Sequence, residues 1–159
     1  MRNERGFTLI ELLAIIVILG IMAAIAIPIV GQIINHSKAD AHLSNARQML
    51  HAGKMAYANG YMPESEYSGE RSYTMEDLIK EGFLDGKIAN PSITSTFGGS
   101  DSYDPDESLV VVYVTDDTFI FKVNLSVAGE YRIFNEPQTL EQISRDVFTE
   151  DFKNELNLK

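Results

Sequence analysis

An uncharged apolar segment near the N-terminus constrains this chain more than any other feature. From Leu12 to Val30 no residue is charged, and nearly all are Leu, Ile, Val, Ala or Met. About 20 such residues are what a helix needs to cross a bilayer. Glu11 stands at the start of this run, although an ionised carboxylate costs roughly 2.5–3.5 kcal/mol at the centre of a membrane helix. An acid kept in such a place indicates a partner outside the segment.

Two ordinary interpretations of the first 30 residues explain them less well. A secretory signal has a shorter apolar region and a small-residue cleavage site after it, and neither feature fits this sequence. A simple membrane anchor would leave Glu11 unexplained. Arg2 and Arg5 precede the apolar run. The positive-inside rule therefore places the N-terminus in the cytoplasm and the residues beyond about 35 outside the cell.

The class III leader and N-terminal helix of type IV pilins and pseudopilins are similar to residues 5–12, which read Arg-Gly-Phe-Thr-Leu-Ile-Glu-Leu. This resemblance implies that a prepilin peptidase cuts after Gly6 and methylates the new terminal amine on Phe7. It also implies an assembly role for Glu11, with Thr8 beside it. In the family the glutamate neutralises the terminal amine of a neighbouring subunit.

The same resemblance implies a domain layout and a set of partners. Residues 1–6 would be a cleaved leader, residues 7–34 the membrane and assembly half of the N-terminal helix, and residues 35–159 an extracellular head. The partners would be copies of the chain in a helical filament, the prepilin peptidase, and an assembly platform with its ATPase. The sequence does not distinguish whether such a filament serves motility, cell adhesion, DNA uptake or secretion. The alternatives are a pseudopilin of a type II secretion or competence system, or a membrane-tethered ligand-binding module that does not polymerise.

Two helix-weakening residues interrupt the apolar segment. Proline lacks an N–H and clashes with the preceding turn, so we expect a kink near Pro28, while Gly20 weakens the helix by about 1 kcal/mol relative to alanine. In filaments of the family, the segment between matching glycine and proline positions loses its helical order. The resemblance therefore implies that Gly20 to Pro28 can melt during assembly, with a static kink in a continuous helix as the alternative that we favour for the isolated subunit.

The fold class that we predict is α+β, a pilin-like layout that begins with one long helix from Thr8 to about Ala58. Its second half carries an amphipathic stripe with spacings of three and four. The helix ends at Gly60, and a surface loop follows over residues 59–73. A capping box at Thr74 then opens a short helix that Gly82 stops. The stripe consists of Ala39, Leu43, Ala46, Leu50, Gly53 and Tyr57.

The later sequence predicts a small antiparallel sheet and a C-terminal helix. Residues 109–115, 118–125 and 130–134 are β-branched and aromatic runs, which indicate a meander of three strands. One sheet face would cover the second half of the long helix. An amphipathic helix over about 139–155, with a break near Thr149, would cover the other face.

Charge and cysteine content narrow the function class. The chain has 13 basic and 23 acidic residues, and the leader holds two of the former and one of the latter, which leaves 11 against 22. A general nucleic-acid binder would need basic residues to neutralise phosphates. There are no cysteines, so the head must be held together by packing alone. Since many Gram-negative pilins carry a disulfide, this favours a Gram-positive source.

Catalytic and metal-binding patterns are scarce, so we expect a structural protein and not an enzyme. His36, His42 and His51 are separated by six and nine residues, which does not give the helical pair that a metal needs, and we interpret them as solvated. The tyrosines at 57, 61, 67 and 73 would either line a binding surface of a tethered module or pack the loop onto the head.

One acidic loop is a candidate calcium site. Four acids within residues 100–107 could supply oxygen ligands, although the EF-hand spacing is absent and acidic loops are usually only solvated. The loop resembles the calcium loop of the major type II secretion pseudopilins. Apart from this calcium hypothesis we expect no cofactor. The candidate ligands are Asp101, Asp104, Asp106 and Glu107.

Overall fold

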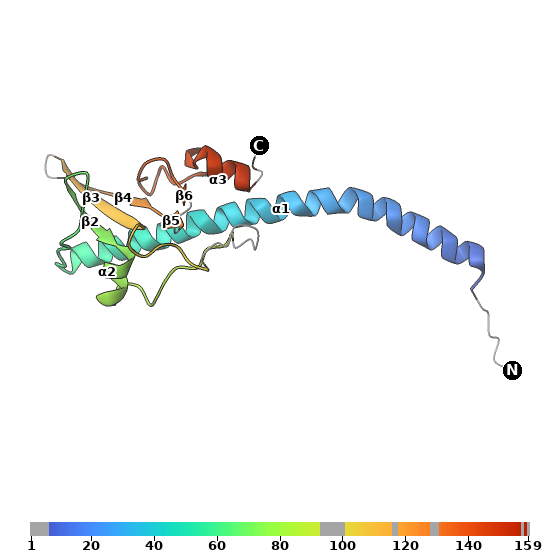
Figure 1. Ribbon diagram of the computed structural model, residues 1–159, viewed down its shortest axis with the longest axis horizontal. Coiled ribbons are helices and arrows are strands. Elements are labelled where there is room, and N and C mark those ends of the chain that lie inside the picture. Colours follow the sequence, from blue (N-terminus) through green and yellow to red (C-terminus); the bar gives the residue numbers. More distant parts are fainter. Residues whose placement is uncertain (1–6, 93–100, 116–117, 128–130, 157, 159) are drawn as a thin grey trace. The chain divides into compact units, whose positions relative to one another are not determined.

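The computed structural model describes residues 7–92, 101–115, 118–127, 131–156 and 158 (Figure 1). The chain folds as two compact units, Met1–Asn35 and His36–Lys159. One helix, α1 (Leu9–Ala58), contributes residues to both units, which confirms the predicted long helix. The side chains of α1 therefore have two different surroundings.

In the first unit, α1 is apolar on every side. All of its large apolar side chains from Leu9 to Ile34 are exposed. By length and composition the helix can cross a membrane, with a mean hydropathy of 3.0 over an 18-residue window. It runs without interruption through Gly20 and Pro28. A helix that is apolar all round needs an apolar environment, which is either lipid or other protein.

In the second unit, one stripe of α1 is buried by the rest of the chain. The predicted inward residues Ala39, Leu43, Ala46, Leu50 and Gly53 are buried, and Tyr57 is half-buried. A Cβ atom added at Gly53 would lie 2.8 Å from Cγ1 and 2.9 Å from Cβ of Val110. The glycine therefore permits an unusually close approach of a strand to α1.

The C-terminal end of α1 is closed by a Schellman motif. Gly60 has a φ of 80°, a left-handed conformation that glycine adopts without a steric cost. The N–H of Tyr61 donates to the carbonyl of Ala56 at 3.0 Å, and the N–H of Gly60 donates to the carbonyl of Tyr57 at 2.9 Å. These two bonds satisfy carbonyls that the helix end would leave unpaired, as predicted for Gly60.

The main sheet of the second unit has four antiparallel strands in the order β1-β2-β3-β4. Val112 of β3 lies opposite Phe121 of β4, and the two side chains share a face. The rings of Phe119 and Phe121 lie 5.0 and 5.4 Å from the ring of Tyr57 on α1, so this face covers α1 as predicted. The strands are β1 (Glu66–Tyr67), β2 (Glu70–Thr74), β3 (Leu109–Thr115) and β4 (Thr118–Asn124).

Two parts of the predicted sheet are wrong. Residues 59–73 were expected to form a loop, but they contain β1 and most of β2, and β2 pairs with β3. The run 130–134 was expected as a third strand of the meander. It contributes only β6 (Tyr131–Arg132), which pairs with β5 (Ser126–Val127) in a separate two-stranded sheet. In the main sheet β3 pairs with β2 on one side and with β4 on the other, and the run 130–134 is not part of this sheet.

The short helix α2 (Met75–Lys80) begins with the predicted capping box. The hydroxyl of Thr74 accepts from the N–H of Asp77, and the Asp77 carboxylate accepts from the N–H of Thr74, both at 3.1 Å. Gly82 follows the helix with a φ of 78°. The predicted start and stop are both confirmed.

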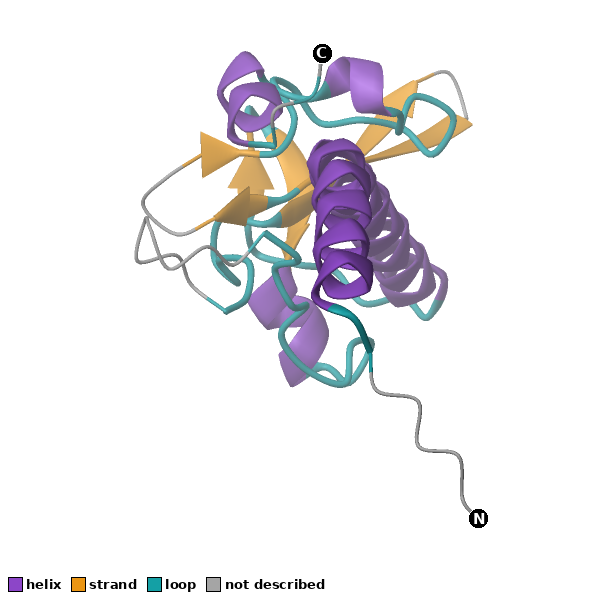
Figure 2. Ribbon diagram, turned by 90° about the vertical axis from the view of Figure 1, so that its right-hand side faces the viewer, coloured by secondary structure: helices purple, strands orange, loops and turns teal. Residues whose placement is uncertain are grey.

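The C-terminal region is less helical than predicted. Between residues 139 and 155 the regular elements are a 3-10 turn, η1 (Arg145–Val147), and α3 (Glu150–Glu155). The predicted break at Thr149 is present, because its hydroxyl caps α3 by accepting from the N–H of Phe152 at 3.2 Å. Helix α3 packs against α1, in contrast to the predicted position on the far sheet face (Figure 2).

Candidate functional site

Thr8 and Glu11 form a capping box at the start of α1. The N–H and the hydroxyl of Thr8 each donate to Oε2 of Glu11 at 2.8 Å. In return the N–H of Glu11 donates to Oγ1 of Thr8 at 3.3 Å. Two backbone donors that would otherwise lack a helical partner are satisfied by this exchange.

The capping box changes the interpretation of Glu11. The sequence pointed to a partner outside the apolar segment, whereas the structure places a first partner, Thr8, three residues away. The spacing Thr-x-x-Glu is itself a capping-box signal, so the contact was detectable in the sequence. Both donors of Thr8 reach the same carboxylate oxygen, Oε2. The second oxygen, Oε1, can therefore accept from a cation without loss of the cap.

Of the other residues predicted for processing and assembly, the structure describes Phe7, Gly20 and Pro28. Gly6 and the leader lie outside the described residues. Phe7 is described, and 80% of its surface is exposed. At Gly20 no heavy atom of the described residues lies within 4 Å of an added Cβ. Melting between Gly20 and Pro28 stays a prediction, and in this structure α1 is helical there.

The acidic loop uses part of its carboxylates for its own structure. Oδ1 of Asp104 accepts from the N–H of Asp106 at 2.9 Å and of Glu107 at 3.1 Å. The Glu107 carboxylate accepts from the hydroxyl of Ser126 at 2.8 Å. Across the described part of the chain, no three acidic, histidine or cysteine side chains gather so that they could hold a metal ion. Calcium binding by Asp101 and these carboxylates stays a prediction.

His42 is buried, and its interpretation as a solvated helix residue is wrong. It is 0% exposed, and it lies on the buried stripe of α1 between Ala39 and Ala46. Its spacing of three and four from these alanines is the signal that could have identified it. The Phe152 ring of α3 packs on it edge to face, with ring centroids 4.6 Å apart.

The imidazole of His42 joins three segments through hydrogen bonds. Its Nδ1 contacts the hydroxyl of Tyr103, and its Nε2 lies 2.7 Å from the hydroxyl of Ser92. Asn45 donates to the Tyr103 hydroxyl at 3.5 Å. Burial, with the charge of Lys38 as a lesser cause, lowers the pKa of His42 to about 3, and burial raises the pKa of Tyr103. The network is therefore uncharged at neutral pH, and it connects the segments around Ser92 and Tyr103 to α1.

The four tyrosines pack against other parts of the chain. Tyr73 is 1% exposed, and its hydroxyl donates to the carbonyl of Tyr61 at 2.8 Å. The ring of Tyr57 contacts β4. The Arg132 guanidinium lies over the ring of Tyr67. The packing alternative is therefore confirmed.

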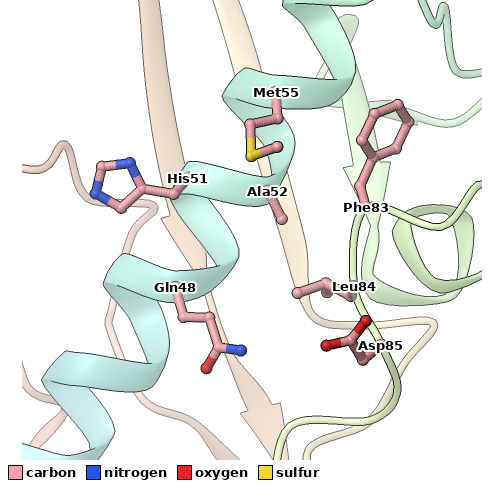
Figure 3. A pocket seen from close by; sticks show the side chains of 7 residues that line it. All are labelled: Gln48, His51, Ala52, Met55, Phe83, Leu84 and Asp85. Carbon is pink, nitrogen blue, oxygen red and sulfur yellow. The ribbon is translucent and has the colours of Figure 1, made fainter.

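A hollow of about 360 Å³ opens between α1 and the segment that follows α2 (Figure 3). The α1 side is formed mainly by Gln48, His51 and Met55, and the opposite side by Phe83, Leu84 and Asp85. Gln48, His51 and Met55 are exposed. This hollow lies on the outward side of α1, opposite the stripe that packs on the sheet.

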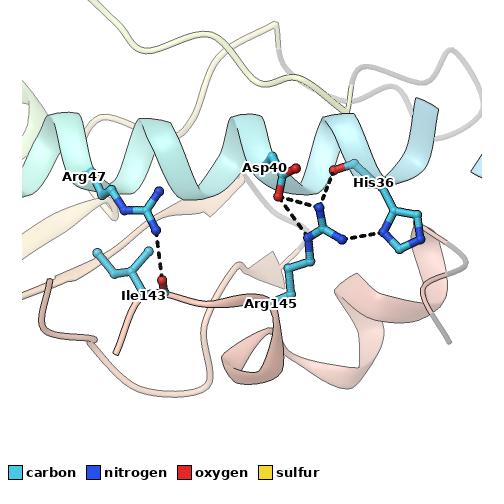
Figure 4. A network of polar contacts seen from close by, with 5 residues as sticks. All are labelled: His36, Asp40, Arg47, Ile143 and Arg145. Atoms are coloured by element: carbon cyan, nitrogen blue, oxygen red, sulfur yellow. Dashed lines mark hydrogen bonds and ion pairs between the residues drawn. The ribbon is translucent and has the colours of Figure 1, made fainter. Parts of the chain in front are cut away.

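The C-terminal segment is fastened to α1 by two arginines (Figure 4). Nε and Nη2 of Arg145 donate to Oδ1 of Asp40 at 2.9 and 2.6 Å. Nη1 of Arg145 donates to Nδ1 of His36 at 2.6 Å. Arg47 donates to the carbonyl of Ile143 at 3.2 Å. The ion pair offsets the charge of the only acid between residues 36 and 58.

The comparisons with known proteins bear on the N-terminal segment. Residues 1–27 match the family model described as the prokaryotic N-terminal methylation motif. Comparisons with curated proteins and with solved structures gave no match. The motif is characteristic of type IV pilins and pseudopilins, which are structural subunits and not an enzyme family. The chain therefore joins this motif to a long apolar helix that packs on a small antiparallel sheet with a C-terminal helix, which is an α+β, pilin-like layout.

Proposed function

We propose that this chain is the precursor of a structural subunit of a type IV pilus-like extracellular filament. The methylation motif over residues 1–27 is the observation that carries the proposal. In the proposed pathway the precursor sits in the cytoplasmic membrane with its head outside, and a prepilin peptidase cuts after Gly6 and methylates Phe7. An assembly platform and its ATPase then add the subunit to a filament. A Gram-positive source remains part of the proposal.

Polymerisation would use the apolar half of α1. Its side chains are exposed in the subunit, so assembly would exchange lipid contacts for contacts with other copies. Oε1 of Glu11 is the atom that would accept from the terminal ammonium of a neighbouring subunit, because Thr8 uses Oε2. In a medium of low dielectric constant such an ion pair is much stronger than in water. The cap of α1 would persist while the pair forms.

Two substitutions at Glu11 separate its charge from its capping role. Glutamine can take the place of glutamate in a capping box, so Glu11→Gln keeps the cap and removes the charge, whereas Glu11→Ala removes both. We expect both variants to be inserted and cleaved, and both to yield few or no surface filaments by electron microscopy. Normal filaments from Glu11→Ala would contradict the assembly role of the carboxylate. Normal filaments from Glu11→Gln alone would reduce that role to capping.

The mature N-terminus tests the processing step directly. Mass spectrometry of the mature chain should find a methylated phenylalanine that corresponds to Phe7. A mature chain that begins at Met1 would overturn the proposal, because the terminal amine would then lie six residues too far from the motif. Electron microscopy also separates a pilin from a pseudopilin, since long surface filaments are expected of the former and only short structures of the latter.

A further inference from the structure

Asn59, the residue directly after α1, belongs to a chemically reactive pair. It is the only one of the nine asparagines that a glycine follows. In such a pair the backbone nitrogen of the glycine can attack the side-chain amide carbon of the asparagine, because glycine has no side chain to hinder the approach. Asn59 is exposed, and a Cβ added at Gly60 would have no heavy atom of the described residues within 4 Å, its chain neighbours aside. Packing therefore does not shield the pair from water.

The hydrogen bonds that end α1 engage both reacting groups of this pair. The nitrogen of Gly60 must lose its proton in order to attack, and this N–H donates to the carbonyl of Tyr57 at 2.9 Å. Nδ2 of Asn59 donates to the carbonyl of Met55, four residues earlier, at 2.7 Å. This bond directs the side chain back along α1, whereas the attacking nitrogen follows Asn59 in the chain. Both bonds must break before the two groups can react.

We propose that Asn59 is a deamidation site whose rate is controlled by the end of α1. When the last turn of α1 opens, the nitrogen of Gly60 bonds to Cγ of Asn59, the Cγ–Nδ2 bond breaks, and ammonia leaves with the proton of that nitrogen. Water then opens the five-membered succinimide at either carbonyl and gives aspartate or isoaspartate at position 59. Water is the only co-reactant, and nothing is oxidised or reduced. The rate follows the fraction of time for which the last turn is open.

The product weakens the same helix end that delays its formation. An ionised aspartate cannot donate, so the carbonyl of Met55 keeps only its bond from the backbone N–H of residue 59, at 3.0 Å. The new negative charge stands at the C-terminal end of α1, where the helix dipole disfavours an anion. Isoaspartate also lengthens the backbone by one carbon, which displaces Gly60 from the Schellman motif. The modification is therefore irreversible, and the end of α1 opens more often after it.

Incubation of the purified full chain in mildly alkaline buffer tests the site. Peptide mass spectrometry follows the mass gain of deamidation at each asparagine, for the folded chain in detergent micelles and for the chain unfolded in urea. In the unfolded chain Asn59 should react first, and in the folded chain it should react about ten to a thousand times more slowly. A smaller difference would overturn the control by α1. A larger one would mean that only global unfolding exposes the pair, which would overturn the proposal as well.

A matched pair of glycine substitutions tests whether the last turn of α1 limits the rate. Ala58 is the last residue of α1, whereas Ala41 lies in the body of the helix. Each alanine-to-glycine change weakens a helix by a similar amount, but only Ala58→Gly acts on the last turn. We expect Ala58→Gly to raise the deamidation rate of the folded chain about threefold or more, and Ala41→Gly to change it by less than about twofold. Equal changes, or no change in Ala58→Gly, would overturn the proposal.

Two substitutions at position 59 test the effect of the product. Asn59→Asp introduces the charge and removes the side-chain donor, so hydrogen exchange at the N–H groups of Gly60 and Tyr61 should become about threefold faster. Asn59→Gln keeps an uncharged donor, and its exchange should stay within about twofold of the unmodified chain. Glutamine would have to close a six-membered ring, so we expect no mass gain at this position. Unchanged exchange in Asn59→Asp would contradict the weakening of the helix end. None of these measurements requires a filament, so they stand or fall independently of the proposed function.

Discussion

The two halves of α1 differ in where their apolar side chains find contacts. In the first unit every large apolar side chain from Leu9 to Ile34 is exposed within the subunit. In the second unit a stripe of the same helix, including Met49 and Leu50, is covered by the chain's own strands and loops. The first half therefore depends on surroundings that other molecules must supply. The stability of the second half belongs to the subunit itself.

The largest effect should come from a matched pair of truncations, Leu50→Ala and Ile18→Ala. Leu50 is 0% exposed and Ile18 is 57% exposed. Truncation of a buried leucine removes packing and leaves a cavity, so Leu50→Ala should lower the free energy of unfolding of the head by about 2–5 kcal/mol. Ile18→Ala should change it by less than about 0.5 kcal/mol. Chemical unfolding of the full chain in detergent micelles, followed by circular dichroism, measures both, and equal losses would break the comparison.

The pH dependence of stability should reveal His42. Its pKa falls from 6.5 to about 3 on folding, so the unfolded chain binds a proton at this residue below pH 6.5 while the folded chain does not. Stability therefore decreases as the pH falls from about 6.5 to about 3, by about 2 kcal/mol between pH 7 and pH 5. Unfolding curves at several pH values measure this slope.

Two glutamine variants isolate the contribution of His42 to that slope. His42→Gln should remove this part of the pH dependence, and His51→Gln, at an exposed position, should keep it. An unchanged slope in His42→Gln would mean that the carboxylates alone account for the acid sensitivity. The result sharpens the comparison, because it shows that the second half of α1 is held by a buried polar network as well as by apolar packing.

The smallest of these effects should come from a matched pair of glycines. An added Cβ at Gly53 meets Val110 at 2.8–2.9 Å, whereas at Gly20 no described atom lies within 4 Å. Overpacking costs about 1–3 kcal/mol, and alanine returns about 1 kcal/mol through helix propensity. Gly53→Ala should therefore lower the stability of the head by about 1 kcal/mol, and Gly20→Ala should leave it unchanged. Thermal unfolding of the two variants measures these changes in stability. A higher stability of Gly53→Ala would show that β3 moves away from α1 easily.

Local signals predicted several elements of the fold correctly. The end of α1 at Gly60, the capping box at Thr74 and the strand β3 each depend on residues close together in the sequence. Strand β2 was missed because Glu70-Arg71-Ser72 has little β propensity, and its pairing with the buried strand β3 supplies the stability. The C-terminal helix was overestimated because its apolar spacing also suits a 3-10 turn followed by a capped short helix.

For the candidate site, the sequence named residues whose assembly role stays a prediction, and it did not give their geometry. The motif identified Thr8 and Glu11. The reciprocal bonds between them match a capping-box spacing, but the cost of an ionised Glu11 in a membrane helix had pointed to a partner outside the segment. His42 was misjudged because the test applied to it was metal spacing. Its place on the buried stripe of α1 was the more informative property.

The capping box has a consequence for the terminus that cleavage would create. If the chain is cut after Gly6, a single residue, Phe7, stands between the new ammonium and the first fixed turn of α1. Neighbouring Cα atoms are about 3.8 Å apart, so the ammonium is tethered within one residue of the carboxylate that its own chain presents. Each subunit then carries its positive terminal ammonium and its negative carboxylate close together on its own chain. The direction from which a neighbouring subunit approaches, and not the reach of its terminus, then decides which subunit supplies the ammonium that pairs with a given carboxylate.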